Sequence, residues 1–186
     1  SYDRFHVVAM AGEAMDEVRR AETRDEPQAV REAFGTASPK TLKQVFWGMR
    51  KNPARWSRAQ GNAMHWLQHS NLKSARAWRL KMALREVYAK ARESNDAVQA
   101  EVDLKAWLSW AQRCRLEPFK KLAATIKQRF AAVVRGMLDH RSNAFVEAMN
   151  GLLQQAKRAA RGFRTSKNFI AIAYLLHRIG DMDGAE

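Results

Sequence analysis

A single carboxylate lies among amides and cations near the C-terminal end of the sequence. Glu147 is the only acidic residue between Asp139 and Asp181, and helical spacing places it on one side of a predicted helix with Asn143, Asn150, Gln154, Lys157, Arg158 and Arg161. The opposite side is apolar and comprises Phe145, Met149, Leu152, Leu153, Ala156, Ala160 and Phe163. One acid beside many cations suits a metal ligand next to a phosphate-bearing polymer, but a solvated helix face produces the same pattern. The residues alone leave both interpretations open.

The positive charge of the chain is concentrated in residues 41–95. The 186 residues include 33 Lys and Arg against 19 Asp and Glu, and the net charge of +14 indicates a polyanionic partner, most simply nucleic acid. Residues 41–95 hold twelve of these cations against two acids, whereas residues 1–40 hold six against eight. Two groups interleave cations with an aromatic residue: Arg55, Trp56, Arg58 and Arg76, Trp78, Arg79. The arginines are predicted DNA contacts, and each Trp either stacks on an unpaired base or belongs to the core.

Other kinds of chemistry have weaker support. His65 and His69 are one helical turn apart, but no acidic residue lies between Arg50 and Arg85 and no Cys is near, so the pair lacks further zinc ligands. The single Cys, Cys114, excludes an internal disulfide and is expected to be a small buried apolar residue. The sequence contains no nucleophile motif and no Gly-rich phosphate loop. It also lacks an apolar run of the ~20 residues that span a membrane.

Apolar residues recur at helical spacing along almost the whole chain, which predicts an all-α bundle. Helices are expected from Val7 into the charged stretch 22–26, over 39–47, 53–67, 72–88, 98–111 and 117–138, then around Glu147 to Gly162, and over 169–179. Residues 48–53 read as a loop, Asn71 as the cap of the helix after it, and Ser94-Asn95-Asp96 as a break followed by a new cap. A hydrophobic content of 46% argues against disorder.

Four segments together resemble one protein family. The first is Asp3-Arg4-Phe5-His6, and the last is the run S-N-A-x-x-E-x-x-N from Ser142 to Asn150, followed by K-R, A-R-G-F-R and Asn168-Phe169. Between them lie two helical segments, residues 72–81 and residues 107–111. In this order they resemble the C-terminal part of DDE-superfamily transposases of the ISL-three insertion-sequence type, and the match covers nearly the whole chain.

The resemblance implies a fold and a division of the chain. It implies a helical insertion plus the closing helices of an RNase H-like α/β core whose strands are largely missing here. Residues 1–6 would end the last core strand and carry the D-R-F-H signature, residues 7–138 would form the insertion, and residues 139–186 would carry the catalytic helix and a terminal helix. The two upstream aspartates of the family have no counterpart in this sequence. We therefore expect a C-terminal fragment that is inactive alone.

The resemblance also implies roles for individual residues. Glu147 would be the third catalytic carboxylate and a ligand of Mg²⁺ or Mn²⁺, while Asp3, His6 and Asn150 would brace the site by hydrogen bonds. Lys157, Arg158, Arg161 and Arg164 would bind DNA phosphates, alongside Arg55, Arg58, Arg76 and Arg79. The intact enzyme would act on transposon ends and target DNA, as a homo-oligomer in the bacterial cytoplasm. The alternative from composition alone is a non-catalytic basic helical DNA- or RNA-binding protein, and a helical interaction protein is a further possibility.

Overall fold

The structure, a computed structural model, describes residues 4–35 and 39–139, and these residues are helical without a strand. Their elements are α1 (Arg4–Asp25), α2 (Pro27–Phe34), α3 (Pro39–Arg50), the 3₁₀ turn η1 (Pro53–Arg55), α4 (Arg58–Gln68), α5 (Lys73–Ser94), α6 (Ala97–Arg113), α7 (Glu117–Gln128) and α8 (Phe130–Leu138). The chain divides into two units at Asp139, and the second unit lies outside the described residues. The predicted all-α class is confirmed for the described part.

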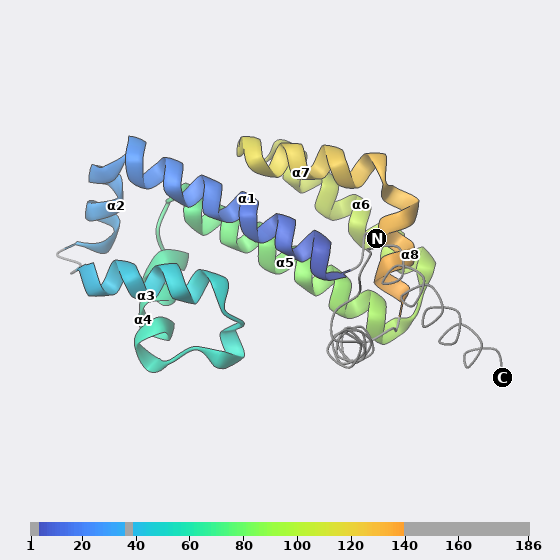
Figure 1. Cartoon of the computed structure of the whole chain (residues 1–186), viewed down its shortest axis with the longest axis horizontal. Helices are drawn as coiled ribbons and strands as arrows, with labels where there is room; N and C mark the ends of the chain where they lie inside the picture. The colour runs from blue at the N-terminus through green and yellow to red at the C-terminus, as the bar shows by residue number, and fades with distance from the viewer. Residues whose placement is uncertain (1–3, 36–38, 140–186) are drawn as a thin grey trace, which may run out of the picture. The chain divides into compact units, whose positions relative to one another are not determined.

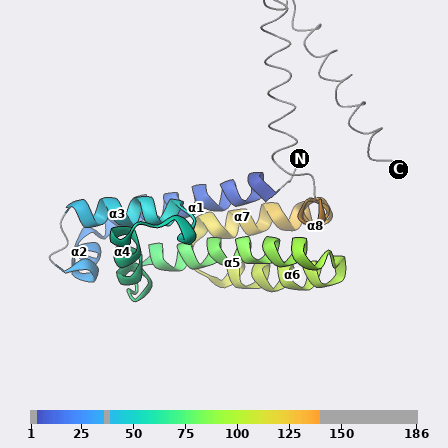
Figure 2. The same ribbon diagram turned by 90° about the horizontal axis from the view of Figure 1, so that it is seen from below.

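Two long antiparallel helices, α1 and α5, form the spine of the first unit (Figure 1). Helices α2, α3 and α4 pack at one end of this pair, and α6, α7 and α8 pack at the other, as the second view also shows (Figure 2). The spine forms because each long helix has an apolar stripe at a spacing of three or four residues, such as Val7, Ala11, Met15 and Val18 in α1. These side chains are buried against α5 and its neighbours in one continuous core.

Local capping signals fix several helix ends. Asn95 closes α5 in the left-handed conformation, and the Asp96 side chain accepts hydrogen bonds from the backbone N–H groups of Val98 and Gln99 at the start of α6. The predicted break at residues 94–96 is therefore confirmed. Helix α4 begins with a capping box in which Ser57 and Gln60 exchange side-chain-to-backbone hydrogen bonds. This cap was not predicted, and it separates η1 from α4, so the single helix expected over 53–67 is wrong.

The predicted loop at residues 48–53 is also wrong in its first part. Helix α3 continues through Gly48 to Arg50, although glycine is a poor helix former. The reason is packing against α4: a Cβ on Gly48 would lie 2.6 Å from Cγ of Met64, which is fully buried. Gly48 is therefore a site of close helix approach and not a helix end.

Three further expectations need correction. The predicted strand end at residues 1–6 is wrong for residues 4–6, which belong to α1 because no breaker separates them from the apolar period at Val7; residues 1–3 lie outside the described residues. Helix α2, after Pro27, was not expected. The helix expected over 117–138 is interrupted at Arg129, which allows α7 to pack on α1 and α6 while α8 packs on α5 and α6. Packing partners, and not a local breaker, explain this interruption.

Candidate nucleic-acid interface

The two Arg-Trp groups predicted to contact DNA come together through their aromatic residues. Trp56, between η1 and α4, packs against Trp78 of α5 with the ring centroids 5.9 Å apart. Trp78 is buried, and the Trp56 indole N–H donates to the carbonyl of Gly48 at 2.8 Å. Both rings therefore hold elements together, which favours the core interpretation of these Trp residues over base stacking.

Four arginines lie within two residues of these Trp residues in the sequence. Arg55 ends η1 and Arg58 starts α4, and both are exposed. On α5, Arg79 is exposed and its guanidinium donates to the carbonyl of Gln68 at 2.9 Å, while Arg76 is half-buried. None of the ion pairs between described residues involves these four arginines. We refer to Arg55, Arg58, Arg76 and Arg79 as the arginine surface.

The acidic residues of the N-terminal helices pair with other parts of the basic segment. Asp16 binds Arg50, and Glu26 pairs with Lys73. Glu22, only 3% exposed, accepts hydrogen bonds from the backbone N–H of Lys73 and, at 2.9 Å, from that of Ser74. This carboxylate thus caps α5, because no side chain of α5 itself does so, and the predicted Asn71 cap is wrong. Asp16, Glu22 and Glu26 are therefore used inside the fold, and none of the three forms an ion pair with the arginine surface.

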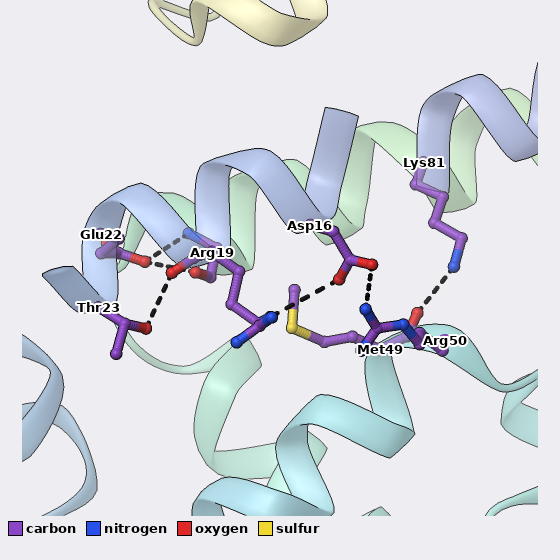
Figure 3. Close-up of polar contacts among 8 residues, drawn as sticks. Asp16, Arg19, Glu22, Thr23, Met49, Arg50 and Lys81 are labelled. Atoms are coloured by element: carbon purple, nitrogen blue, oxygen red, sulfur yellow. Dashed lines mark hydrogen bonds and ion pairs between the residues drawn. The ribbon is translucent and has the colours of Figure 1, made fainter. Parts of the chain in front are cut away.

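A second basic cluster lies where α1, α3 and α5 meet (Figure 3). Asp16 is its carboxylate, paired with Arg50 and, at 3.6 Å, with Arg19. Lys81 is only 5% exposed, and its ammonium donates to the carbonyl of Met49 at 2.8 Å, one residue before the end of α3. Sequence reasoning missed this cluster because Asp16, Arg50 and Lys81 lie 30 or more residues apart in the chain.

Burial determines the charge behaviour of this cluster. The pKa of Lys81 is lowered from its ordinary 10.5 to about 8, chiefly because burial desolvates the ammonium; repulsion from Arg85 and Arg50 contributes to the lowering, and Asp16 opposes it. Burial also lowers the pKa of Arg19, although Asp16 acts in the opposite direction. Two guanidinium groups lie over the ring of Phe46, that of Arg50 at 3.6 Å and that of Arg19 at 4.7 Å from its centroid. The ring therefore fixes the position of both cations.

A cleft of about 490 Å³ opens between α2, α4 and the start of α5. Its lining mixes signs, because Glu26 and Glu32 face the same space as Lys73 and Arg76. Trp66 also lines it and is 61% exposed. Trp66 was not among the predicted site residues. The apolar period of α4, with Ala63, Met64 and Leu67 buried, could have placed it on the solvent side.

Comparison with known proteins identifies the family. The model of the DDE transposases of the ISL3 type, described as "Transposase", matches residues 1–173. The chain belongs to this transposase family. Two curated relatives from Mycobacterium tuberculosis, strains CDC 1551 / Oshkosh and ATCC 25618 / H37Rv, are named transposase for insertion sequence element IS1557, and each is 36% identical over 190 residues. The alignment covers 93% of this chain and 41% of each relative, so the chain spans about two fifths of their length. No solved structure matches significantly.

Seven residues to which the sequence analysis gives a role in catalysis or phosphate binding lie outside the described residues. These are Asp3, Glu147, Asn150, Lys157, Arg158, Arg161 and Arg164. His6 is exposed on α1. Among residues 4–35 and 39–139, no three His, Cys, Asp or Glu side chains gather in positions to hold a metal ion. Within the same ranges, no helix has both the length and the apolar character needed to cross a bilayer.

The histidine pair, His65 and His69, and the single cysteine, Cys114, lie within the described residues. The ring centroids of His65 and His69 lie 4.2 Å apart, and Nδ1 of His69 is 2.8 Å from the carbonyl oxygen of His65. Cys114 is half-buried at the end of α6, with its sulfur 3.8 Å from the carbonyl of Leu116, and packs against the core. It is thus less buried than the sequence suggested.

Proposed function

We propose that this chain is a DNA-binding, all-α part of an insertion-sequence transposase, and that the arginine surface contacts the DNA backbone. The observation that carries the proposal is the separation of charge. Acids of α1 and the start of α2 pair with Arg50 and Lys73 or cap α5, whereas Arg55, Arg58 and Arg79 stay exposed beside the Trp56–Trp78 contact. Guanidinium groups that lack carboxylate partners are suited to bind phosphate oxygens in pairs.

The geometry favours backbone recognition over base recognition. Trp78 is buried, and Trp56 is partly buried and hydrogen-bonded to the carbonyl of Gly48, so both rings serve the fold. Phosphate contacts position a protein on DNA without reading its sequence. We therefore propose that this part of the chain contributes affinity and orientation, with sequence choice left to other parts of a transposase.

The test measures DNA binding at several salt concentrations by fluorescence anisotropy. The slope of log K against log salt is negative. The double variant Arg55→Gln/Arg58→Gln should reduce its magnitude by about 1.8, because each phosphate contact on B-DNA contributes roughly 0.9. The matched control is Lys127→Gln/Arg135→Gln, which removes two exposed cations from α7 and α8. Equal losses of slope in both variants would mean that only net charge matters and would contradict the arginine surface.

We further propose that Glu147 is the metal-binding carboxylate of the transposase, with Asn150 beside it and Lys157, Arg158, Arg161 and Arg164 as phosphate contacts. This assignment rests on the motif from Ser142 to Asn150. A bound Mg²⁺ or Mn²⁺ would supply Lewis-acid stabilisation of phosphodiester oxygens. Because the other two carboxylates of the family have no counterpart here, we expect residues 1–186 to bind DNA without cleaving it.

The test of Glu147 uses an active member of the family in which the aligned glutamate is replaced by glutamine. Strand cleavage should be lost while DNA binding is retained, since glutamine keeps the shape and removes the anionic ligand. Undiminished cleavage would remove Glu147 from the site. The finer partners that the resemblance implies belong to the same proposal: transposon ends and target DNA, a homo-oligomer and a cytoplasmic location in bacteria.

A further inference from the structure

The cluster between α1, α3 and α5 contains more positive charge than the fold uses. Its cations are Arg19 of α1, Arg50 at the end of α3, and Lys81 and Arg85 of α5, and the carboxylate among them is Asp16. Asp16 is itself only 16% exposed. Four cations against one anion leave an excess of three positive charges at a site where water screens them incompletely. The cations therefore repel one another, and a nearby anion would relieve this repulsion.

The partners inside the fold do not remove this excess. The ammonium of Lys81 is bound by a carbonyl at the C-terminal end of α3, which offers only a partial negative charge. Arg85 takes part in none of the ion pairs between described residues, and its guanidinium makes a weak 3.9 Å contact with the sulfur of Met82. Arg50 keeps 34% of its side chain exposed although it binds Asp16. The cluster thus reaches solvent through arginine groups.

The cluster is also pre-arranged. The ring of Phe46 lies under Arg50 and Arg19, and Asp16 holds both from the side. Arginines that are fixed before binding lose less side-chain entropy when they bind an oxyanion. Arg50 is followed directly by Lys51 and then by η1, which ends at Arg55, so the cluster continues along the chain into the arginine surface.

We propose that Arg50 and Arg85, backed by Lys81, bind a DNA backbone phosphate as a second contact besides the arginine surface. The proposal rests on the DNA-binding function proposed above. The ligand is a phosphodiester strand because the excess of three positive charges exceeds what one oxyanion neutralises, and because Lys51 and Arg55 follow Arg50 in the chain as further cations for adjoining phosphates. A free phosphate ion would not depend on those neighbours.

The experiment compares salt-dependent duplex binding of three variants with the unchanged chain. Arg85→Gln should weaken binding roughly tenfold near 0.1 M salt, because one charge-assisted contact is lost. The magnitude of the slope of log K against log salt should fall by about 0.9. Arg85→Lys should recover most of the slope. Asp16→Asn should bind DNA more tightly, because it removes the anion that competes with phosphate. Arg20→Gln, on the exposed side of α1, is the control for loss of one charge.

The opposite signs separate ligand binding from a structural role. If Arg85 and Asp16 only maintained the fold, both variants would weaken binding, and circular dichroism would show lower melting temperatures. Two results would overturn this site while leaving the arginine surface intact. One is an unchanged slope of log K against log salt in Arg85→Gln, and the other is weaker DNA binding by a folded Asp16→Asn variant. Failure of the unchanged chain to bind any DNA would overturn the proposed function, and this inference with it. The melting temperature of the chain should rise more with a DNA duplex than with inorganic phosphate at the same phosphate concentration. An equal rise with inorganic phosphate would also overturn the proposal.

Discussion

Replacement of Lys81 by methionine should change how the stability of this protein depends on pH. Lys81 is only 5% exposed, and its ammonium donates to the carbonyl of Met49, with Arg85 and Arg50 as like-charged neighbours and Asp16 as the opposing charge. Methionine has a similar length and no charge. The variant therefore removes both the hydrogen bond and the titration, and the pH dependence isolates the second effect.

The magnitude follows from the two pKa values of Lys81. The pKa is about 8 in the folded protein and 10.5 in the unfolded chain. Between these values the unfolded chain holds a proton that the folded protein has released, so the free energy of unfolding rises with pH. Each pKa unit corresponds to about 1.4 kcal/mol, which gives about 3.4 kcal/mol in all. Roughly 2 kcal/mol of this gain falls between about pH 7 and about pH 9.5.

Urea unfolding followed by circular dichroism at about pH 7 and about pH 9.5 measures this change. The unchanged chain should gain about 2 kcal/mol more than Lys81→Met over this interval. Groups that titrate in both proteins cancel in the comparison. Lys90→Met, at an exposed position of the same helix, is the matched control and should behave as the unchanged chain does. Identical pH dependence in the unchanged chain and Lys81→Met would refute the view that a buried cation is held at the α1–α3–α5 junction.

Two further changes test the packing between helices by urea unfolding. Glu22→Ala should lower the free energy of unfolding by about 2–3 kcal/mol, because buried N–H groups at the start of α5 lose their acceptor. The control, Glu17→Ala at an exposed position of α1, should change it by less than about 0.5 kcal/mol. Gly48→Ala should destabilise by roughly 1–3 kcal/mol, because its Cβ would meet buried Met64, whereas Gly61→Ala has open space and should stabilise by about 0.5–1 kcal/mol. Stabilisation by both alanines would show that α3 and α4 approach less closely.

The candidate interface was only partly predictable. Uneven charge along the chain is visible in the sequence, and it indicates Arg55, Arg58 and Arg79 correctly as exposed cations. The sequence could not decide whether Trp56 and Trp78 serve DNA or the core. That depends on a contact between residues more than twenty positions apart, which local spacing does not encode.

Helix type, several helix boundaries and the family follow from the sequence alone. They depend on signals that act within about four residues, such as the period of α1 or the Asn95-Asp96 break, and on motifs that are read directly. The tertiary structure alone decided that Glu22 caps α5 from 51 residues away, and that Lys81 is buried against α3. It also decided that the helix after Glu117 breaks at Arg129. In each case the deciding partner lies on another helix, and its proximity is produced by burial of the shared core and not by neighbouring residues in the chain.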